Sequence, residues 1–186
     1  VDISELDEAG NIPVTEVAGR LKDALDIERV TKKFYREYAD ERIHFTELIE
    51  GIDDDHDRRW YASILLNRLM FIYFLQQKYF LDNGNINYLQ NKLTETKQKH
   101  GDNKYYDVFM KALFFEGFAK PEKERSPDAR ELLGEIKYLN GGLFLPHRIE
   151  SDYKNIRMPD KAFENIFQLF GRYSWNLNDI PGGRDD

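Results

Sequence analysis

The stretch WYASILLNRLMFIYFLQQKYFL, residues 60–81, places apolar side chains on nearly every side of a helical wheel. This pattern is typical of a helix that is buried all round. We therefore expect a central helix over about 57–81, ended by the turn residues LDNGN at 81–85. Its longest apolar run, 69–75, carries Arg68 and Gln76 at its ends. That run is much shorter than the roughly 20 residues of a membrane span, so we expect no membrane partner.

Most of the remaining chain also has helical periodicity, with apolar residues at spacings of three and four. Ser126 followed by Pro127 is a typical helix start, and Gly171 is a typical helix end. The fold class that we predict is mainly α, a multi-helix domain. The predicted helices are 15–24, a longer one capped by Asp26 and continuing to about 52, 86–93, 105–117, one from Pro127, and 159–170.

A short segment, YLNGGLFLPH at 138–147, interrupts the helical pattern. Asn140-Gly141-Gly142 is suited to a tight turn, because these residues tolerate positive φ. The short apolar flanks 136–139 and 143–145 then predict a β-hairpin or a sharp extended turn. In this interpretation Leu139, Leu143 and Phe144 anchor the turn in the core. The segment lacks the Lys-Ser/Thr of a phosphate-binding loop.

Composition limits the classes of function. The chain has 186 residues, of which 41% are hydrophobic and 14% aromatic, which suits one folded domain. Its formal net charge of −7 argues against a free-standing basic nucleic-acid binder, but it permits a local basic face. The absence of cysteine excludes disulfides and thiolate metal sites, and it favours a cytoplasmic location. We expect a single domain over 1–186, cut from a longer protein, with 1–13 flexible and 176–186 a linker.

One local basic face could contact nucleic acid. Its lysines alternate with Tyr105 and Tyr106, which suggests contacts to the sugar-phosphate backbone of DNA. The alternative is an ordinary solvated helix surface, which the nearby Glu95, Asp102 and Asp107 support. The candidate DNA-backbone residues are Lys92, Lys97, Lys99, Lys104 and Lys111, and a smaller patch comprises Lys32, Lys33 and Arg36.

The run DDDHD, residues 53–57, is the strongest metal-like pattern. Its alternate aspartates match the start of a calcium loop, but Arg58 and Ile64 stand where the loop needs glycine and glutamate. Carboxylates at a helix start are also stabilised by the helix dipole. We therefore interpret this run as a solvated helix start, and we expect no metal site.

A nuclease pattern is the second candidate for chemistry. Asp128, Glu135 and Lys137 could hold Mg²⁺ and assist an attacking water. The spacing argues against it, because Asp128 follows a helix cap and about two helical turns separate it from Glu135. His147 has no acidic or nucleophilic neighbour close in sequence, so we assign it no catalytic role. We expect no catalytic residue in this chain.

Several segments of the chain resemble a region of large restriction–modification proteins. The closest in pattern are YLNGGLFLPH, MPDKAFENIFQLFGRYSWNLND and PGGRDD, and ALDIERVTKKFYREY and residues 60–81 resemble an earlier part of the same region. These proteins are the single-chain type IIG-like enzymes and related adenine-specific DNA methyltransferases. The resemblance implies a mostly helical connector ahead of a methyltransferase domain, in many members after a nuclease-like domain.

The resemblance also limits what this chain does by itself. The methyltransferase motifs would follow Asp186: the chain holds no Gly-rich S-adenosylmethionine loop and no Asn-Pro-Pro-Tyr tetrad. No catalytic residue is carried over, and Asn140-Gly141-Gly142 is carried over only as an architectural turn. We expect a non-catalytic spacer that positions DNA in a phage-defence enzyme. The implied partners are DNA and the adjacent domains; the implied cofactors, for the whole protein only, are S-adenosylmethionine and, as a further candidate, Mg²⁺. The alternatives are a Mg²⁺-dependent nuclease fragment and a protein-interaction module unrelated to DNA.

Overall fold

The structure is a computed structural model that describes residues 14–139 and 142–175. Of the described residues, 14–39 belong to one compact unit and the others, within 40–175, to a second. The predicted single domain over 1–186 stays a prediction, and the predicted flexible and linker ends lie outside the described residues.

The N-terminal helical region is one helix, α2 (Val14–Glu47), instead of the two that the sequence pattern predicts. Asp26 therefore does not begin a new helix. An aspartate inside a helix costs less than about 1 kcal/mol relative to alanine, which uninterrupted backbone hydrogen bonding can offset. The helix ends at Glu47, before the predicted end near 52. Beyond it Ile49 and Ile52 are buried in a segment without regular secondary structure.

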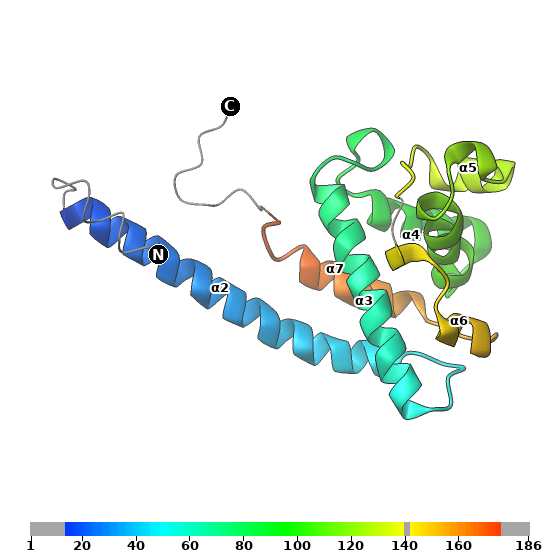
Figure 1. The fold of residues 1–186 in the computed structure, drawn as a ribbon, viewed down its shortest axis with the longest axis horizontal. Helices are drawn as coiled ribbons and strands as arrows, with labels where there is room; N and C mark the ends of the chain where they lie inside the picture. Colours follow the sequence, from blue (N-terminus) through cyan, green and yellow to red (C-terminus); the bar gives the residue numbers. More distant parts are fainter. Residues whose placement is uncertain (1–13, 140–141, 176–186) are drawn as a thin grey trace. The chain divides into compact units, whose positions relative to one another are not determined.

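The second unit is built from helices of several kinds (Figure 1). Among the described residues none forms a strand, and the isolated β-bridge between Glu50 and Arg157 is the one strand-like pairing. The predicted mainly α class is thus confirmed. The α-helices of this unit after α2 are α3 (Asp55–Gln77), α4 (Tyr88–His100), α5 (Pro127–Leu133), α6 (Arg148–Asp152) and α7 (Asp160–Phe170). The π-helical segments are η2 (Tyr105–Met110) and η3 (Leu113–Phe118), and the 3₁₀ turns are η1 (Asp82–Gly84), η4 (Glu122–Glu124) and η5 (Gly142–Phe144).

The predicted central helix is α3, which crosses α7 in Figure 1. It ends at Gln77, before the predicted end at 81, and it is not buried all round, because Trp60 and Phe71 are 55% and 38% exposed. The Asp54 side chain caps its first turn, accepting the Asp57 N–H at 2.7 Å. Tyr73 of α3 packs against Phe170 of α7, with ring centroids 5.2 Å apart. The two polar ends of its apolar run are also buried, because Arg68 and Gln76 are 1% and 0% exposed. This helix is the element around which the other helices pack.

Two local predictions need correction. Residues 105–117 form π-helical segments rather than one regular α-helix. The flanks of the glycine turn are not hairpin strands: 136–139 is irregular and Gly142–Phe144 is a 3₁₀ turn. Asn140 and Gly141 themselves lie outside the described residues. Phe144 is buried as expected, but Leu143 is 38% exposed.

Capping predictions at two other helices are confirmed. Ser126 accepts the Ala129 N–H at the start of α5, with Pro127 in the first turn, and Gly171 follows the last residue of α7. None of the helices in the described part of the chain has the length and apolar character needed to cross a membrane.

Candidate functional site

The most buried charge of the second unit serves the fold. Arg68 on α3 forms an ion pair with Glu150 on α6, at 2.6 Å. The same guanidinium donates to the carbonyl oxygens of Leu143 and Leu145, at 2.8 and 2.9 Å. It therefore holds the segment that follows the glycine turn against the central helix. The sequence pattern had no signal for this role, because the three partners lie 75 to 82 residues away.

Arg125, 4% exposed, is the second buried cation. It donates to the backbone carbonyls of Glu116, Gly117 and Ile136, the last two at 2.7 Å. Two of these carbonyls belong to the C-terminal half of η3, where a helix dipole favours positive charge. Burial lowers the pKa of the Arg125 guanidinium from its ordinary value. The residue acts as a cap for η3.

Asp160 caps the start of η2, as Arg125 caps the end of η3. Its carboxylate accepts the backbone N–H groups of Asn103 and Tyr105, at 2.8 and 3.1 Å. Asn103 returns a bond, since its side-chain oxygen accepts the Asp160 N–H at 3.1 Å. The buried charges of this unit thus satisfy backbone groups at irregular helix ends.

His147 is also structural in this arrangement. Its Nδ1 accepts the Ile149 N–H at 3.2 Å, and Glu150 accepts the His147 N–H at 2.7 Å. The pair forms a capping box for α6. No sequence pattern predicts this short helix, because histidine is not among the residues preferred at a helix start.

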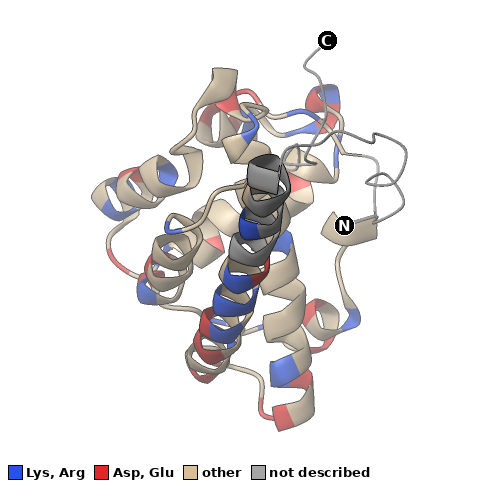
Figure 2. Cartoon of the chain, turned by 90° about the vertical axis from the view of Figure 1, so that its left-hand side faces the viewer, with Lys and Arg blue, Asp and Glu red and all other residues tan. Residues whose placement is uncertain are grey.

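The predicted basic face is largely paired with acidic residues. Three of its five lysines form ion pairs: Lys92 with Glu95 at 2.9 Å, Lys97 with Glu164 at 2.8 Å, and Lys111 with Asp107 at 2.6 Å. The hydrogen bond from Lys97 to Glu164 raises the pKa of the Lys97 ammonium. Figure 2 likewise shows positive and negative segments interspersed over the helices.

The remaining two lysines of this face, Lys99 and Lys104, are exposed and form no ion pair with the residues that the structure describes. The tyrosines between the lysines cannot offer stacking surfaces, because Tyr105 and Tyr106 are 0% and 2% exposed. The Tyr106 hydroxyl instead shares a hydrogen bond with that of Tyr61. Burial raises the pKa of both phenols well above the ordinary range.

The acidic run before α3 brings Asp54, His56 and Asp57 together, with ligand atoms within 4.8 Å of one another. Each of these three side chains already has a partner within the protein. Asp57 accepts from Arg148 at 2.7 Å and from the Tyr153 hydroxyl at 3.3 Å. Asp54 caps the helix, and the His56 ring stacks on Trp60 with centroids 6.4 Å apart. The hydrogen bond from Arg148 is the main cause that lowers the pKa of the Asp57 carboxyl.

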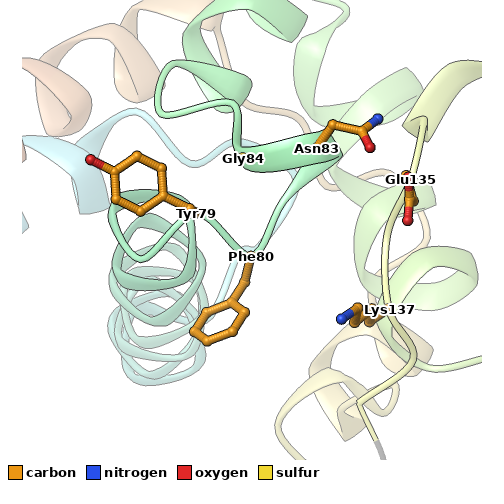
Figure 3. A pocket seen from close by; sticks show the side chains of 6 residues that line it. All are labelled: Tyr79, Phe80, Asn83, Gly84, Glu135 and Lys137. Carbon is orange, nitrogen blue, oxygen red and sulfur yellow. The ribbon is translucent and has the colours of Figure 1, made fainter. Parts of the chain in front are cut away.

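The three residues of the nuclease pattern do not share one site in the structure. Glu135 and Lys137 face one hollow, while Asp128 lies in the first turn of α5 and does not line it. The hollow measures about 440 Å³ and is shown in Figure 3. Its other walls come from the turn after α3, whose sequence predicts only a helix end. The residues lining it are Tyr79, Phe80, Asn83, Gly84, Glu135 and Lys137.

Comparison with known proteins gives one informative similarity. The chain is 28% identical over 131 residues to a protein of Methanocaldococcus jannaschii named "Putative type II restriction enzyme and methyltransferase". The match covers 69% of this chain and 11% of the relative's length. No family model matches the chain. No solved structure matches it significantly. The similarity supports a distant relationship between this chain and restriction–modification proteins.

Proposed function

We propose that this chain is a non-catalytic helical region of a restriction–modification DNA adenine methyltransferase, where it spaces the catalytic domains and positions the DNA. The observation that carries the proposal is the similarity over 131 residues to a protein named as a restriction enzyme and methyltransferase. The resemblance of residues 138–147 to the connector of such enzymes agrees with it. In this proposal S-adenosylmethionine and any Mg²⁺ bind elsewhere in the whole protein.

The use of the buried charges supports a scaffold role. Arg68, Arg125 and Asp160 are each at most 4% exposed, and each binds backbone groups. The partners of Arg68 and Asp160 lie 55 or more residues away in the chain, and the Ile136 carbonyl lies 11 residues from Arg125. A buried charge with satisfied hydrogen bonds specifies one arrangement of the elements around it. A spacer needs such rigidity, because its length and shape would set the distance between the domains that it joins.

The exposed lysines suggest where the DNA backbone would lie. Lys99 and Lys104 are unpaired among the described residues and can displace counterions from phosphates. Lys92, Lys97 and Lys111 would first have to leave their carboxylate partners. We therefore expect weak binding to duplex DNA, carried mainly by Lys99 and Lys104.

Fluorescence anisotropy with a labelled 20-base-pair duplex over a salt series tests the proposal. We expect salt-sensitive binding, with no strand cleavage in Mg²⁺ and no methyl transfer from S-adenosylmethionine. The double variant Lys99→Ala/Lys104→Ala should reduce the slope of log K against log[salt] by about 2, because each lysine that pairs with a phosphate contributes about 1 to the slope. The matched control Lys92→Ala/Lys111→Ala should change the slope less. Binding without salt dependence, or cleavage that needs the metal, would contradict the proposal.

A further inference from the structure

The helix α2 gathers four cations on one of its faces. Helical residues that are three, four and seven positions apart lie on the same side. Because α2 runs unbroken from Val14 to Glu47, this rule places Arg29 on the same side as the small patch that the sequence suggests. All four side chains are exposed. We call this face the α2 basic stripe; its residues are Arg29, Lys32, Lys33 and Arg36.

The charge of the stripe differs from that of the whole chain. The segment RVTKKFYR, residues 29–36, holds four cations and no carboxylate, whereas the formal net charge of the chain is −7. Lys22, also exposed, lies seven residues before Arg29 and therefore on the same face. A group of like charges on one helix face is unfavourable by itself, because neighbours three and four residues apart repel each other. An anionic partner would remove this repulsion.

The two arginines of the stripe are not neutralised within the protein. Lys32 pairs with Glu28 at 2.5 Å and Lys33 with Glu37 at 3.7 Å, but these lysines are 72% and 69% exposed. Ion pairs at such exposed positions are weak, so an incoming anion can replace the carboxylates. Arg29 and Arg36 form no ion pair with any residue that the structure describes. Their guanidinium groups are suited to bidentate binding of phosphate oxygens.

The opposite side of α2 is the side that packs against protein. Phe34, Tyr38 and Phe45 follow one another at helical spacing on that side. Phe34 and Tyr38 are half-buried, with ring centroids 5.7 Å apart. Phe45 is 0% exposed, and its ring centroid lies 6.2 Å from that of Phe163. Because the apolar side is already covered, the stripe is the side of α2 that is open to a partner.

We propose that the α2 basic stripe binds the phosphates of a DNA duplex. Arg29 and Arg36 are seven residues apart, which is about 10 Å along the helix axis. A duplex carries one phosphate for about every 1.7 Å of its axis, so each arginine can reach a phosphate. Contacts to phosphates carry no direct sequence information, and we therefore expect binding that does not depend on base sequence. That the polyanion is DNA rests on the proposed function; the charge of the stripe does not.

This contact is separate from the one expected at Lys99 and Lys104. Those lysines belong to the second unit and would carry the weak duplex binding of that unit. The stripe belongs to the first unit and adds a contact made by α2. Each contact can therefore be removed without changing the residues of the other.

Two other kinds of partner fit the stripe less well. The centre of a protein–protein interface is depleted of charged residues, whereas every member of the stripe is charged. A helix that lies on a membrane buries its apolar side in the lipid. On α2 that side continues into Phe45, which is packed against protein. A duplex requires only the exposed cations.

Fluorescence anisotropy of the 186-residue chain with a labelled 20-base-pair duplex, between 50 and 200 mM salt, tests the proposal. Arg29→Ala/Arg36→Ala should lower the slope of log K against log[salt] by about 2, because each cation that pairs with a phosphate contributes about 1. Over this fourfold range of salt, the unchanged chain should lose about 16-fold more affinity than the variant. The melting temperature should stay the same, because alanine favours a helix and neither arginine has an ion pair to lose.

Arg36→Ala and Arg42→Ala form a matched pair of controls. Each removes an exposed arginine of α2 that has no ion pair among the described residues. Arg42 lies six residues after Arg36, which places it about 120° away around the helix. Arg36→Ala should lower the slope by about 1, and Arg42→Ala should lower it less. Arg29→Lys/Arg36→Lys keeps both charges and should keep the slope.

Three results would overturn the proposal. The first is an unchanged slope in Arg29→Ala/Arg36→Ala, and the second is no binding of the duplex by the unchanged chain at 50 mM salt. The third is sedimentation of the chain with phosphatidylserine vesicles that is tighter than its duplex binding and is lost in Arg29→Ala/Arg36→Ala. That result would assign the stripe to a lipid surface.

These results can be told apart from a failure of the proposed function. An unchanged slope in Arg29→Ala/Arg36→Ala together with a lower slope in Lys99→Ala/Lys104→Ala would overturn the stripe alone. The reverse pattern would support the stripe and contradict the contact at Lys99 and Lys104. Cleavage or methyl transfer by the chain would contradict the non-catalytic role without changing the result for the stripe.

Discussion

Arg68 of α3 and Glu150 of α6 form an ion pair 2.6 Å long in which the side chains are 1% and 9% exposed. Arg68 also binds the carbonyls of Leu143 and Leu145, and its guanidinium lies 5.0 Å from the centre of the Phe114 ring. One side chain thus joins the central helix, the segment after the glycine turn, and η3. Burying a charged group lowers the stability of the fold, and leaving it buried without its partner lowers the stability more.

Arg68→Ala should therefore destabilise the fold by about 3–5 kcal/mol, because Glu150 is left buried without its partner. Equilibrium urea unfolding followed by circular dichroism measures the loss. The double variant Arg68→Met/Glu150→Leu removes both charges and should be less destabilised than Arg68→Ala. If the double variant has a lower free energy of unfolding than Arg68→Ala, the ion pair is not what holds the two helices together.

Gly51→Ala and Gly101→Ala form a matched pair. Both glycines have positive φ, at 80° and 84°, but only Gly51 would place a Cβ against the carbonyl of Asn155. Gly101, with ψ of −179°, lies in a backbone region that is essentially restricted to glycine, so Gly101→Ala should cost about 1–3 kcal/mol from backbone strain alone. Gly51→Ala should cost more, because the bridge between Glu50 and Arg157 must also move. The melting temperatures of the two variants make the comparison. Equal decreases would show that the backbone at Asn155 can move away from a side chain at position 51.

Asp160→Ala should open the start of η2. It removes the acceptor from the N–H groups of Asn103 and Tyr105, and each buried donor left unsatisfied costs about 1–3 kcal/mol. Hydrogen exchange should become faster for the amides of 103–110 more than for those of α5. Asp160→Asn keeps one acceptor oxygen and should show a smaller change. An equal increase in exchange rate in both regions would show that the whole fold loses stability, not only the start of η2.

Glu41→Gln should stabilise the protein at neutral pH. Burial raises the pKa of the Glu41 carboxyl above its ordinary value of 4.5, and its Oε1 has no hydrogen-bond partner among the described residues. Because the folded state holds this proton more tightly than the unfolded chain, stability is lost as the pH rises from about 4.5 through the raised pKa. Glu41→Gln cannot ionise, so it does not lose stability in this way. Its free energy of unfolding should therefore exceed that of the unchanged protein by more at pH 7 than at pH 4.

Urea unfolding at these two values of pH tests the prediction, with Glu47→Gln as a control on the exposed side of the same helix. An advantage of Glu41→Gln that does not change with pH would show that Glu41 ionises in the folded state as easily as in the unfolded chain.

The local elements of the fold could be predicted from the sequence, and the candidate site could not. The all-round apolar pattern of α3, the Ser126 cap and the Gly171 helix end each depend on residues within one or two helical turns. The hollow joins 79–84 to 135–137. The sequence pattern marks the first segment only as a helix end and the second only as part of a nuclease pattern, so neither indicates the other as its neighbour. The lysines were predicted as a group, but their carboxylate partners include Glu164, 67 residues away from Lys97.

Local sequence patterns were enough to set the mainly α class, the central position of α3 and most helix starts, because periodicity and capping act between near neighbours. Which polar groups are buried, and what they bind, depends instead on the packed arrangement of the helices. The segment 105–118 becomes π-helical where Asp160 and Arg125 satisfy its two ends. Arg68 acquires its role in the same way. These outcomes depend on contacts across 8 to 82 residues of chain, which no local pattern encodes.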